Sequence, residues 1–409
     1  MKTLIFHVDV NSAYLSWEAA RRVARGEADI RLIPSAIGGD REKRTGVILA
    51  KSIPAKKYHV QTGEPVAMAL RKCPQLYLAQ PDFRLYEKNS RAFMDICRKY
   101  APLVEKYSID ECFLDMSGTS QLYPDPVAIA TRIKNEIRDT LGFTVNIGIG
   151  SNKLLAKMAS DFEKPDKVHT LFIDEVEEKL WPLPVRELFT VGRATAERLE
   201  KVRIRTIGEL AKTDPGFLQS LVGVKLGRQL HEYANGISHS LVLSRPEEAK
   251  GYSNSTTLEK DVRSFEEAHR ILLALADSVA ARMRADKVRA YCICVTIRSS
   301  DFKDRSHQRK LFEPTDITTE IFEVAKGLFA ELWDANSPLR LLGIALTDLA
   351  QDNYVQQSLF MDEKRERGEK LDRAVDNIRR QFGSNTISRG GVLRSGIQVG
   401  KKYKAQLDK

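Results

Sequence analysis

Three acidic residues, Asp9, Asp110 and Glu111, have the chemistry and the positions to bind divalent metal ions. Asp9 lies near the end of LIFHVDV, an apolar and β-branched segment that is typical of a buried central strand. Asp110 and Glu111 lie inside Val104–Met116, which we predict to be a hairpin. Pairing of these strands would bring the carboxylates together. Mg²⁺ needs oxygen ligands on rigid elements, so this set suits phosphoryl transfer assisted by two metal ions.

Asp110 and Glu111 are adjacent in the chain, which limits the backbone conformations in which both can bind the same metal ion. Consecutive strand residues point to opposite faces of a sheet, so Asp110 and Glu111 can serve one metal centre only at a turn or bulge. An acidic pair taken alone is more often surface charge or a strand cap, and that interpretation stays open at this point.

The elements that would position these residues follow from the spacing of apolar side chains. A basic stretch from about Arg31 to Gln75, rich in glycine and proline, indicates a small inserted subdomain. Around it we predict helices and one strand. The helices are Asn11–Arg25, Tyr86–Tyr100, Val127–Leu141 and one capped by Ser151 or Asn152 that runs toward Phe162, and the strand is Thr144–Ile149.

The second half of the chain shows three further patterns. Val185–Ala211 predicts two short helices around a Val191-Gly192 turn, with a weaker copy at Leu221–Ala234. Leu243–Gly251 predicts a linker. Beyond it we predict helices at Ser264–Ala285, Thr318–Leu332 and Glu363–Phe382, and strands at Tyr291–Arg298 and Leu341–Leu346.

Composition narrows the class of protein. The chain has 409 residues, of which 42% are hydrophobic, enough for about two to four domains. Its net charge of +10 favours nucleic acid as a partner over a membrane. With no apolar run of ~20 residues and no signal-peptide pattern, we expect a cytoplasmic protein. The five cysteines lack zinc-ligand spacing and are interpreted as reduced core residues.

Three segments of the sequence resemble the motifs of a known protein family. HVDVNSAY, YSIDECFLD and GIGSNKLLAKMASDFEKP resemble the palm motifs of Y-family DNA polymerases of the DinB and UmuC type (DNA polymerase IV-like, the ImpB/MucB/SamB family), in order and over about residues 1–350. The resemblance implies an α+β multidomain, right-hand polymerase. Its expected parts are a palm (1–10 and 76–165), fingers (11–75), a helix-hairpin-helix thumb (166–242), a linker (243–251), an α/β little finger (252–350) and a C-terminal tail (351–409).

The same resemblance implies an activity and its partners. We expect a DNA-templated DNA polymerase that transfers nucleotides from dNTPs to a primer 3′-hydroxyl with two Mg²⁺ ions per active site. Low fidelity, translesion synthesis and the lack of proofreading are implied as well. Primer-template DNA, dNTP and the bacterial sliding clamp are the expected partners of a monomer.

Site residues follow from the matched motifs. Asp9, Asp110 and Glu111 are the implied catalytic metal ligands, joined by the carbonyl of Val10, and Tyr14 is the implied steric gate against a ribose 2′-hydroxyl. Lys153 stays unassigned. The implied nucleotide-binding residues are Val10, Asn11, Ser12, Ala13, Tyr14, Lys56 and Lys157.

Three residues depart from the family pattern. Ile53 stands where a tyrosine is common, and Lys56 stands where an arginine is common. Lysine cannot reproduce the bidentate fork of arginine, so the triphosphate contact is expected to differ. Asn11 replaces a frequent aspartate, which leaves the metal ligands in place but puts the local geometry in question.

Two further sets concern macromolecular partners. The thumb turn and a basic strand-loop-strand of the little finger predict DNA-backbone contacts, although a simple turn and a solvated surface remain alternatives. The residues are Val191, Gly192, Arg193, Arg298, Lys303, Arg305 and Arg309. The pentapeptide Gln356, Gln357, Ser358, Leu359 and Phe360 resembles the bacterial clamp-binding peptide, unless Leu359 and Phe360 merely pack on the little finger.

Two other functions compete with this hypothesis. A nucleotidyl cyclase also uses a palm-like sheet with carboxylates and two metals, but the predicted thumb and clamp peptide have no purpose there. A catalytically inert DNA-binding repair factor that docks on the clamp would not need Asp9, Asp110 and Glu111.

Overall fold

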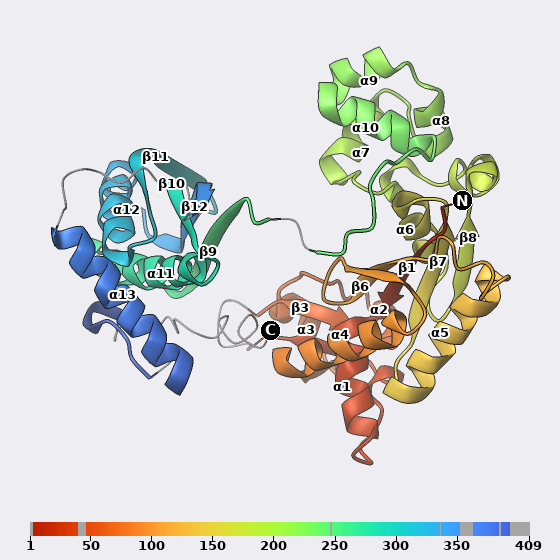
Figure 1. Ribbon diagram of the computed structural model, residues 1–409, viewed down its shortest axis with the longest axis horizontal. Coiled ribbons are helices and arrows are strands. Elements are labelled where there is room, and N and C mark those ends of the chain that lie inside the picture. The colour runs from red at the N-terminus through yellow and green to blue at the C-terminus, as the bar shows by residue number, and fades with distance from the viewer. Residues whose placement is uncertain are drawn as a thin grey trace. The chain divides into compact units, whose positions relative to one another are not determined.

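The computed structural model describes residues 3–39, 46–245, 248–335, 337–351, 363–383 and 386–392 (Figure 1). These residues fall into two compact units, which divide between positions 245 and 248. Each unit is described by itself. Among the described helices, none combines the length and the hydropathy needed to cross a bilayer.

A five-stranded sheet forms the centre of the first unit, in the order β5-β6-β1-β7-β8. The middle strand β1 runs antiparallel to both β6 and β7. β5 and β6 pair as the predicted hairpin, which is thereby confirmed. The strands are β1 (Ile5–Val10), β5 (Leu103–Lys106), β6 (Glu111–Asp115), β7 (Val145–Gly150) and β8 (Val168–Leu171).

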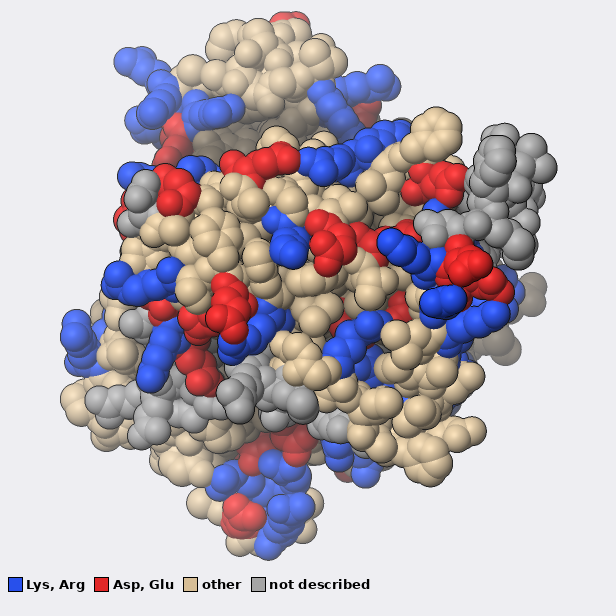
Figure 2. All heavy atoms as spheres, turned by 90° about the vertical axis from the view of Figure 1, so that its left-hand side faces the viewer, with Lys and Arg blue, Asp and Glu red and all other residues tan. Residues whose placement is uncertain are grey.

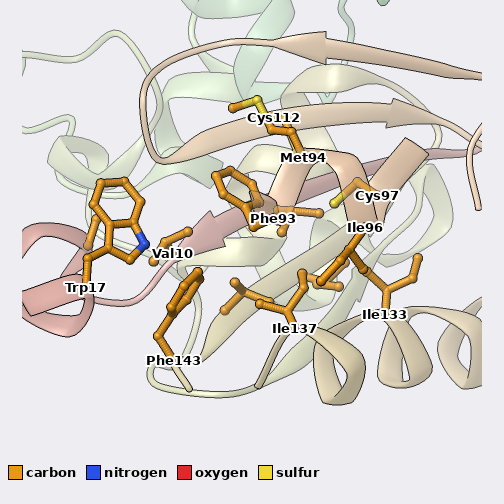
Figure 3. Close-up of a cluster of buried hydrophobic side chains, with 14 of the residues drawn as sticks. Val10, Trp17, Phe93, Met94, Ile96, Cys97, Cys112, Ile133, Ile137 and Phe143 are labelled. Carbon is orange, nitrogen blue, oxygen red and sulfur yellow. The ribbon is translucent and has the colours of Figure 1, made fainter. Parts of the chain in front are cut away.

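Helices cover both faces of this sheet (Figure 1). One face shares a hydrophobic core with α1, α4 and α5, where Trp17, Phe93 and Phe143 are fully buried (Figure 3). The other face carries α6, whose start is capped by Asn152 as predicted. The helices are α1 (Ala13–Val23), α4 (Phe83–Arg98), α5 (Pro126–Leu141) and α6 (Lys153–Asp161).

Alternation along β1 decides which residues face α6. Phe6 and Val8 belong to the core with α4 and α5. His7, between them, lies 2.8 Å from the hydroxyl of Ser160 on α6 through its Nδ1 atom. Because every second strand residue shares a face, the side chain of Asp9 belongs to the α6 side of the sheet.

Glycines allow α6 to approach β7 closely. A Cβ atom on Gly148 would lie 2.0 Å from the carbonyl oxygen of Ala156 and 2.3 Å from the amide nitrogen of Ser160. A Cβ on Gly150 would lie 2.6 Å from the amide nitrogen of Ala156. No side chain larger than hydrogen fits at either position without displacing the helix.

A small sheet and its helices follow α1 in the chain. β2 pairs antiparallel with β3 and parallel with β4, and Ile48, Val60 and Val66 form a separate core beneath them. The elements are β2 (Ser35–Gly38), β3 (Ile48–Lys51), α2 (Ile53–Lys56), α3 (Val66–Lys72) and β4 (Tyr77–Ala79).

Short helices complete the first unit after β8. The first helix predicted around Val191-Gly192 is only one 3₁₀ turn, η4 (Val185–Glu187), and the second is α7. These helices share a core with α6. They are α7 (Arg193–Lys201), α8 (Ile207–Lys212), α9 (Pro215–Val222) and α10 (Val224–Ala234).

The second unit is a four-stranded antiparallel sheet in the order β11-β10-β12-β9 with helices packed on it. The helices predicted at Thr318–Leu332 and Glu363–Phe382 are confirmed with those bounds. The elements are β9 (Gly251–Val262), α11 (Phe265–Ala285), β10 (Val288–Ser299), β11 (Asp304–Thr315), α12 (Thr318–Leu332), β12 (Leu339–Gln351) and α13 (Glu363–Phe382).

One edge strand of this sheet, β9, was missed in the sequence, and the other, β11, was predicted only as the second strand of the basic strand-loop-strand, without bounds. β9 reads GYSNSTTLEKDV and β11 reads DRSHQRKLFEPT, and neither shows an apolar alternation. Most of their side chains are exposed or half-buried. Polar and charged residues are expected on edge strands because they discourage pairing with other chains, and they also remove the periodic signal.

Buried ion pairs attach α13 to the second unit. Arg379 pairs with Asp277 of α11 at 2.7 Å, and both side chains are at most 5% exposed. Arg284, also on α11, pairs with Asp372 at 3.1 Å and with Asp376 at 2.6 Å. A buried charge without its partner is costly, so these pairs specify one position for the helix.

Gly148→Ala is expected to lower stability by about 1–3 kcal/mol or more, because α6 must move to admit the added methyl group. Thermal unfolding monitored by circular dichroism would show a melting temperature several degrees lower. Gly192→Ala serves as the control, since a Cβ there meets nothing within 4 Å. Equal melting temperatures for Gly148→Ala and the wild type would contradict the close packing of α6.

Candidate active site

A cavity of about 460 Å³ opens in the first unit between the end of β1 and the small sheet. The start of α1 contributes Ser12, Ala13 and Tyr14. The residues lining the cavity are Asp9, Val10, Ser12, Ala13, Tyr14, Leu49, Ala50, Lys51, Lys56, Thr62 and Asp110. It therefore gathers two of the three predicted carboxylates with most of the predicted nucleotide-binding residues.

The two strands place the carboxylates as neighbours. Asp9 and Glu111 are register partners on β1 and β6, so both side chains lie on the α6 face. Asp110 precedes β6 in a bend, and its carbonyl oxygen accepts a hydrogen bond from the amide of Val10 at 3.0 Å. The bend releases Asp110 from strand alternation, which is the condition that the adjacent pair required.

Each carboxylate is held by a different group of the protein. Asp9 pairs with Lys164 at 2.6 Å, Glu111 pairs with Lys157 at 2.7 Å, and the hydroxyl of Ser108 donates to Asp110 at 2.7 Å. In the described ranges, no three His, Cys, Asp or Glu side chains are arranged closely enough to hold a metal ion. Glu111 does not line the cavity.

The electrostatics of Asp9 test whether a divalent cation suits this place. Burial raises the pKa of Asp9 to about 6, although Lys164 lowers it, and Glu111 adds a smaller increase. One ammonium group therefore does not compensate the buried negative charge. A divalent ion bound by hard carboxylate oxygens would supply the missing positive charge, so the chemistry of these side chains suits such an ion, although among the described residues their spacing forms no three-ligand site.

Two residues of this region were not singled out in the sequence. Lys164 lies within the third motif, so the motif itself was a usable signal. His7 lies two residues before Asp9, with its Nε2 atom 4.0 Å from Glu111. Burial lowers the pKa of His7 well below its usual value, and nearby Lys157 lowers it further, so the ring is neutral.

Tyr14 both packs and lines the cavity. Its ring centroid lies 4.7 Å from that of Tyr86 and 5.9 Å from that of Trp17. Burial and the nearby charge of Asp110 raise the pKa of its hydroxyl. Ser12, two residues earlier, has φ 49° and ψ 48°, a left-handed conformation that turns the chain from β1 into α1.

The other predicted lysines divide into two groups. Lys56 lines the cavity from α2, and Lys157 reaches Glu111 from α6. Lys153, which stayed unassigned, bonds both carboxylate oxygens of Glu105 at 2.7 Å. That pairing occupies Lys153 within the first unit, away from the cavity lining.

The predicted DNA-contact residues are largely paired with acids. Gly192 precedes the first turn of α7, where Arg193 pairs with Glu197 at 2.7 Å. In the second unit, Arg298 pairs with Asp304, Lys303 with Asp301, and Arg309 with Glu331, and within the described residues Arg305 forms no ion pair. Figure 2 likewise shows basic side chains interspersed with acidic ones on the face it presents.

The predicted clamp-binding peptide, Gln356 to Phe360, lies outside the described residues. Its assignment remains a prediction from the sequence. The five cysteines are free thiols, four of them buried, as the sequence predicts.

Comparison with known protein families gives three matches. Residues 8–161 match the impB/mucB/samB family, and residues 249–359 match its C-terminal domain. Residues 186–238 match the thumb domain of DNA polymerase-iota. Together the three matches cover both units.

Individual relatives extend over nearly the whole chain. The chain is 44% identical over 394 residues to DNA polymerase IV of Clostridium acetobutylicum, covering 96% of this chain and 99% of that one. It is 37% identical over 394 residues to DNA polymerase IV 1 of Bacillus subtilis, covering 96% and 93%. A chimaeric Y-family DNA polymerase of solved structure shares the fold, with a TM-score of 0.73, 21% identity and coverage of 85% of this chain and 99% of that one.

Asp9→Asn is expected to stabilise the protein above pH 6 in EDTA. With a folded pKa of about 6 against 3.8 unfolded, the folded state keeps a proton that the unfolded state loses. The free energy of unfolding therefore falls as pH rises from about 4 to 6, by up to about 3 kcal/mol, and stays lower above that range. Asparagine does not ionise, so the variant does not lose this free energy. Lys164 still has an ion-pair partner in the variant, because it also pairs with Asp161 at 2.8 Å.

Melting temperatures at pH 5 and pH 8 measure this difference. The variant should exceed the wild type at pH 8, by more than it does at pH 5. Asp95→Asn, at an exposed site on α4, should show no such gap. A variant that melts at or below the wild-type temperature at both pH values would contradict the cost of ionising Asp9.

Proposed function

We propose that this chain, which belongs to the impB/mucB/samB family, performs low-fidelity translesion synthesis by a two-metal mechanism. The proposal starts from its identity as a DNA-directed DNA polymerase of the Y family. DNA and nucleotides are substrates of such an enzyme, and its family depends on divalent metal. The observation that carries the proposal is the cavity that Asp9 and Asp110 line together with Tyr14, Lys51 of β3 and Lys56 of α2.

The carboxylates of Asp9, Asp110 and Glu111, with the carbonyl of Val10, would hold two Mg²⁺ ions. When bound, these supply activation of the primer 3′-hydroxyl and neutralisation of the triphosphate. The chain supplies the remaining positive charge. Lys51 and Lys56 line the cavity, and Lys157 and Lys164 already pair with Glu111 and Asp9.

Tyr14 is proposed as the gate that excludes ribonucleotides. Its ring packs near those of Tyr86 and Trp17, and the residue also lines the cavity. A rigid aromatic wall at this position leaves no room for a 2′-hydroxyl. Val10, Ser12 and Ala13 also line the cavity, where the sugar and phosphates would lie.

Low fidelity rests on the size of the parts that cover the cavity. The small sheet has strands of only three or four residues and helices of four and seven. So small a cover encloses a nascent base pair loosely, which tolerates damaged templates. No segment of the sequence resembles a proofreading exonuclease.

Docking on the bacterial sliding clamp through Gln356–Phe360 is the proposed source of processivity for a monomeric enzyme. A glutamine followed by Leu-Phe suits a site with hydrogen-bonding groups beside an apolar pocket. The competing function, an inert repair factor that docks on the clamp, predicts docking without nucleotide incorporation.

Primer extension with Mg²⁺ tests the catalytic proposal. Wild-type protein should add dNTPs to a primed template, and Asp110→Asn or Glu111→Gln should reduce kcat/KM by at least about 100-fold, because each removes a charged ligand. Asp95→Asn should extend normally. Omitting the divalent ion should stop synthesis.

Two results of the primer-extension assay would contradict the catalytic proposal. Wild-type protein that adds no deoxynucleotides would leave the inert clamp-docking factor as the better function. Normal extension by Glu111→Gln would remove Glu111 from the catalytic set.

Replacement of Leu359 and Phe360 by alanine should abolish pull-down of the bacterial sliding clamp and spare distributive synthesis. The matched control replaces Leu371 and Phe382 of α13, which are 51% and 69% exposed. If both double variants retain the clamp equally, the peptide has a packing role instead.

A further inference from the structure

Two buried amide side chains link the end of β1 to the segment after α6. Asn11, just beyond β1, is 9% exposed, and Asn146 on β7 is fully buried. The Nδ2 atom of Asn11 donates a hydrogen bond to the Oδ1 atom of Asn146 at 3.1 Å. The two residues stand 135 positions apart, so only the fold joins them.

Other bonds fix the orientation of Asn146. Its Nδ2 atom donates to the carbonyl oxygens of Ser160 at 3.1 Å and Glu163 at 2.6 Å. Its Oδ1 atom accepts from the amide of Lys167 at 3.3 Å as well as from Asn11. Reversal of this amide would lose every one of these bonds in a buried place, so Oδ1 must face Asn11.

The orientation of Asn11 is fixed in the same way. Its Oδ1 atom accepts from the hydroxyl of Thr144 at 3.0 Å and from the amide of Asp166 at 3.0 Å. Its Nδ2 atom is therefore the donor toward Asn146. A carboxylate at position 11 would bring two acceptors together there, with no hydrogen between them.

The segment held by these amides carries Lys164. Residues 163–167 lie between α6 and β8 without regular secondary structure. The two amides bind the backbone at Glu163, Asp166 and Lys167, on both sides of Lys164. The ammonium group of Lys164 reaches Asp9 at 2.6 Å from this segment.

We propose that Asn11 and Asn146 are positioning residues, which hold residues 163–167 so that the ammonium group of Lys164 lies against Asp9. The role deepens the proposed polymerase function and rests on it. It also gives asparagine at position 11 a structural reason, because the fixed Oδ1 atom of Asn146 requires a donor. Neither Asn11 nor Asn146 is among the residues that line the cavity, so we expect both to act through Lys164.

Asn11→Asp tests this inference with little change in shape. Lys164 should react with a lysine-specific acylating reagent at least about threefold faster, while Lys153, which lies outside this segment and pairs with Glu105, should keep its rate, as followed by mass spectrometry of the folded protein. The kcat/KM for incorporation of a single dNTP should fall at least about tenfold, as displaced catalytic groups do. The contact of Lys134 with the Asp166 side chain at 2.8 Å is left in place.

Control and second variants separate positioning from stability. Ser90→Ala removes a buried hydroxyl from α4 and should change neither readout. Asn146→Ala should reproduce the effect of Asn11→Asp without adding charge. A uniform rise in the labelling of all lysines, or loss of folded protein in both amide variants, would assign the pair to palm stability and overturn the proposal.

The remaining outcomes are also decisive. Unchanged labelling of Lys164 in Asn11→Asp would overturn the proposed positioning, and faster labelling with an unchanged kcat/KM would overturn its part in the reaction. A wild-type protein without incorporation would instead refute the polymerase function. Labelling of Lys164 does not depend on that activity, so the two failures are distinguishable.

Discussion

The buried negative charge of Asp9 is the constraint on which the site depends. A carboxylate at the end of a central strand loses hydration, and burial raises its pKa to about 6. Glu111 lies opposite it and adds a like charge. Two lysines partly compensate these charges. Lys157 of α6 pairs with Glu111, and Lys164 of the segment after α6 pairs with Asp9. The buried carboxylate of Asp9 lowers the free energy of unfolding and favours a bound cation. Functional sites often reduce stability in this way.

The approach of α6 to the sheet makes that compensation possible. Glycine at positions 148 and 150 lets the helix lie against β7, so lysines from this helix and its end reach carboxylates on β1 and β6. The same helix also belongs to the core of α7 to α10. One helix therefore joins the charge balance of the site to the helical part of the first unit.

The second unit contains buried ion pairs between α11 and α13. There, Arg284 and Arg379 pair with carboxylates of α11 and α13 in largely buried positions. Such pairs need not add much stability, but breaking one leaves a buried charge, so they select one arrangement of α13. Arg298 of β10 and Arg309 of β11 are in contrast paired at the surface, where an ion pair is weak and a polyanion can compete for the cation.

The sequence alone determined the β5–β6 hairpin, the helices with clear periodicity and the family motifs that contain the three candidate carboxylates, because these signals are local in the chain. It did not reveal β9 or the bounds of β11, because the exposed side chains of these edge strands need no apolar alternation. Nor did it show that Asp9 meets Lys164, or that Asn11 meets Asn146, since these partners are 155 and 135 positions apart. Only the tertiary structure decided such contacts, because strand pairing and the packing of α6 on glycine set which distant side chains share one buried space.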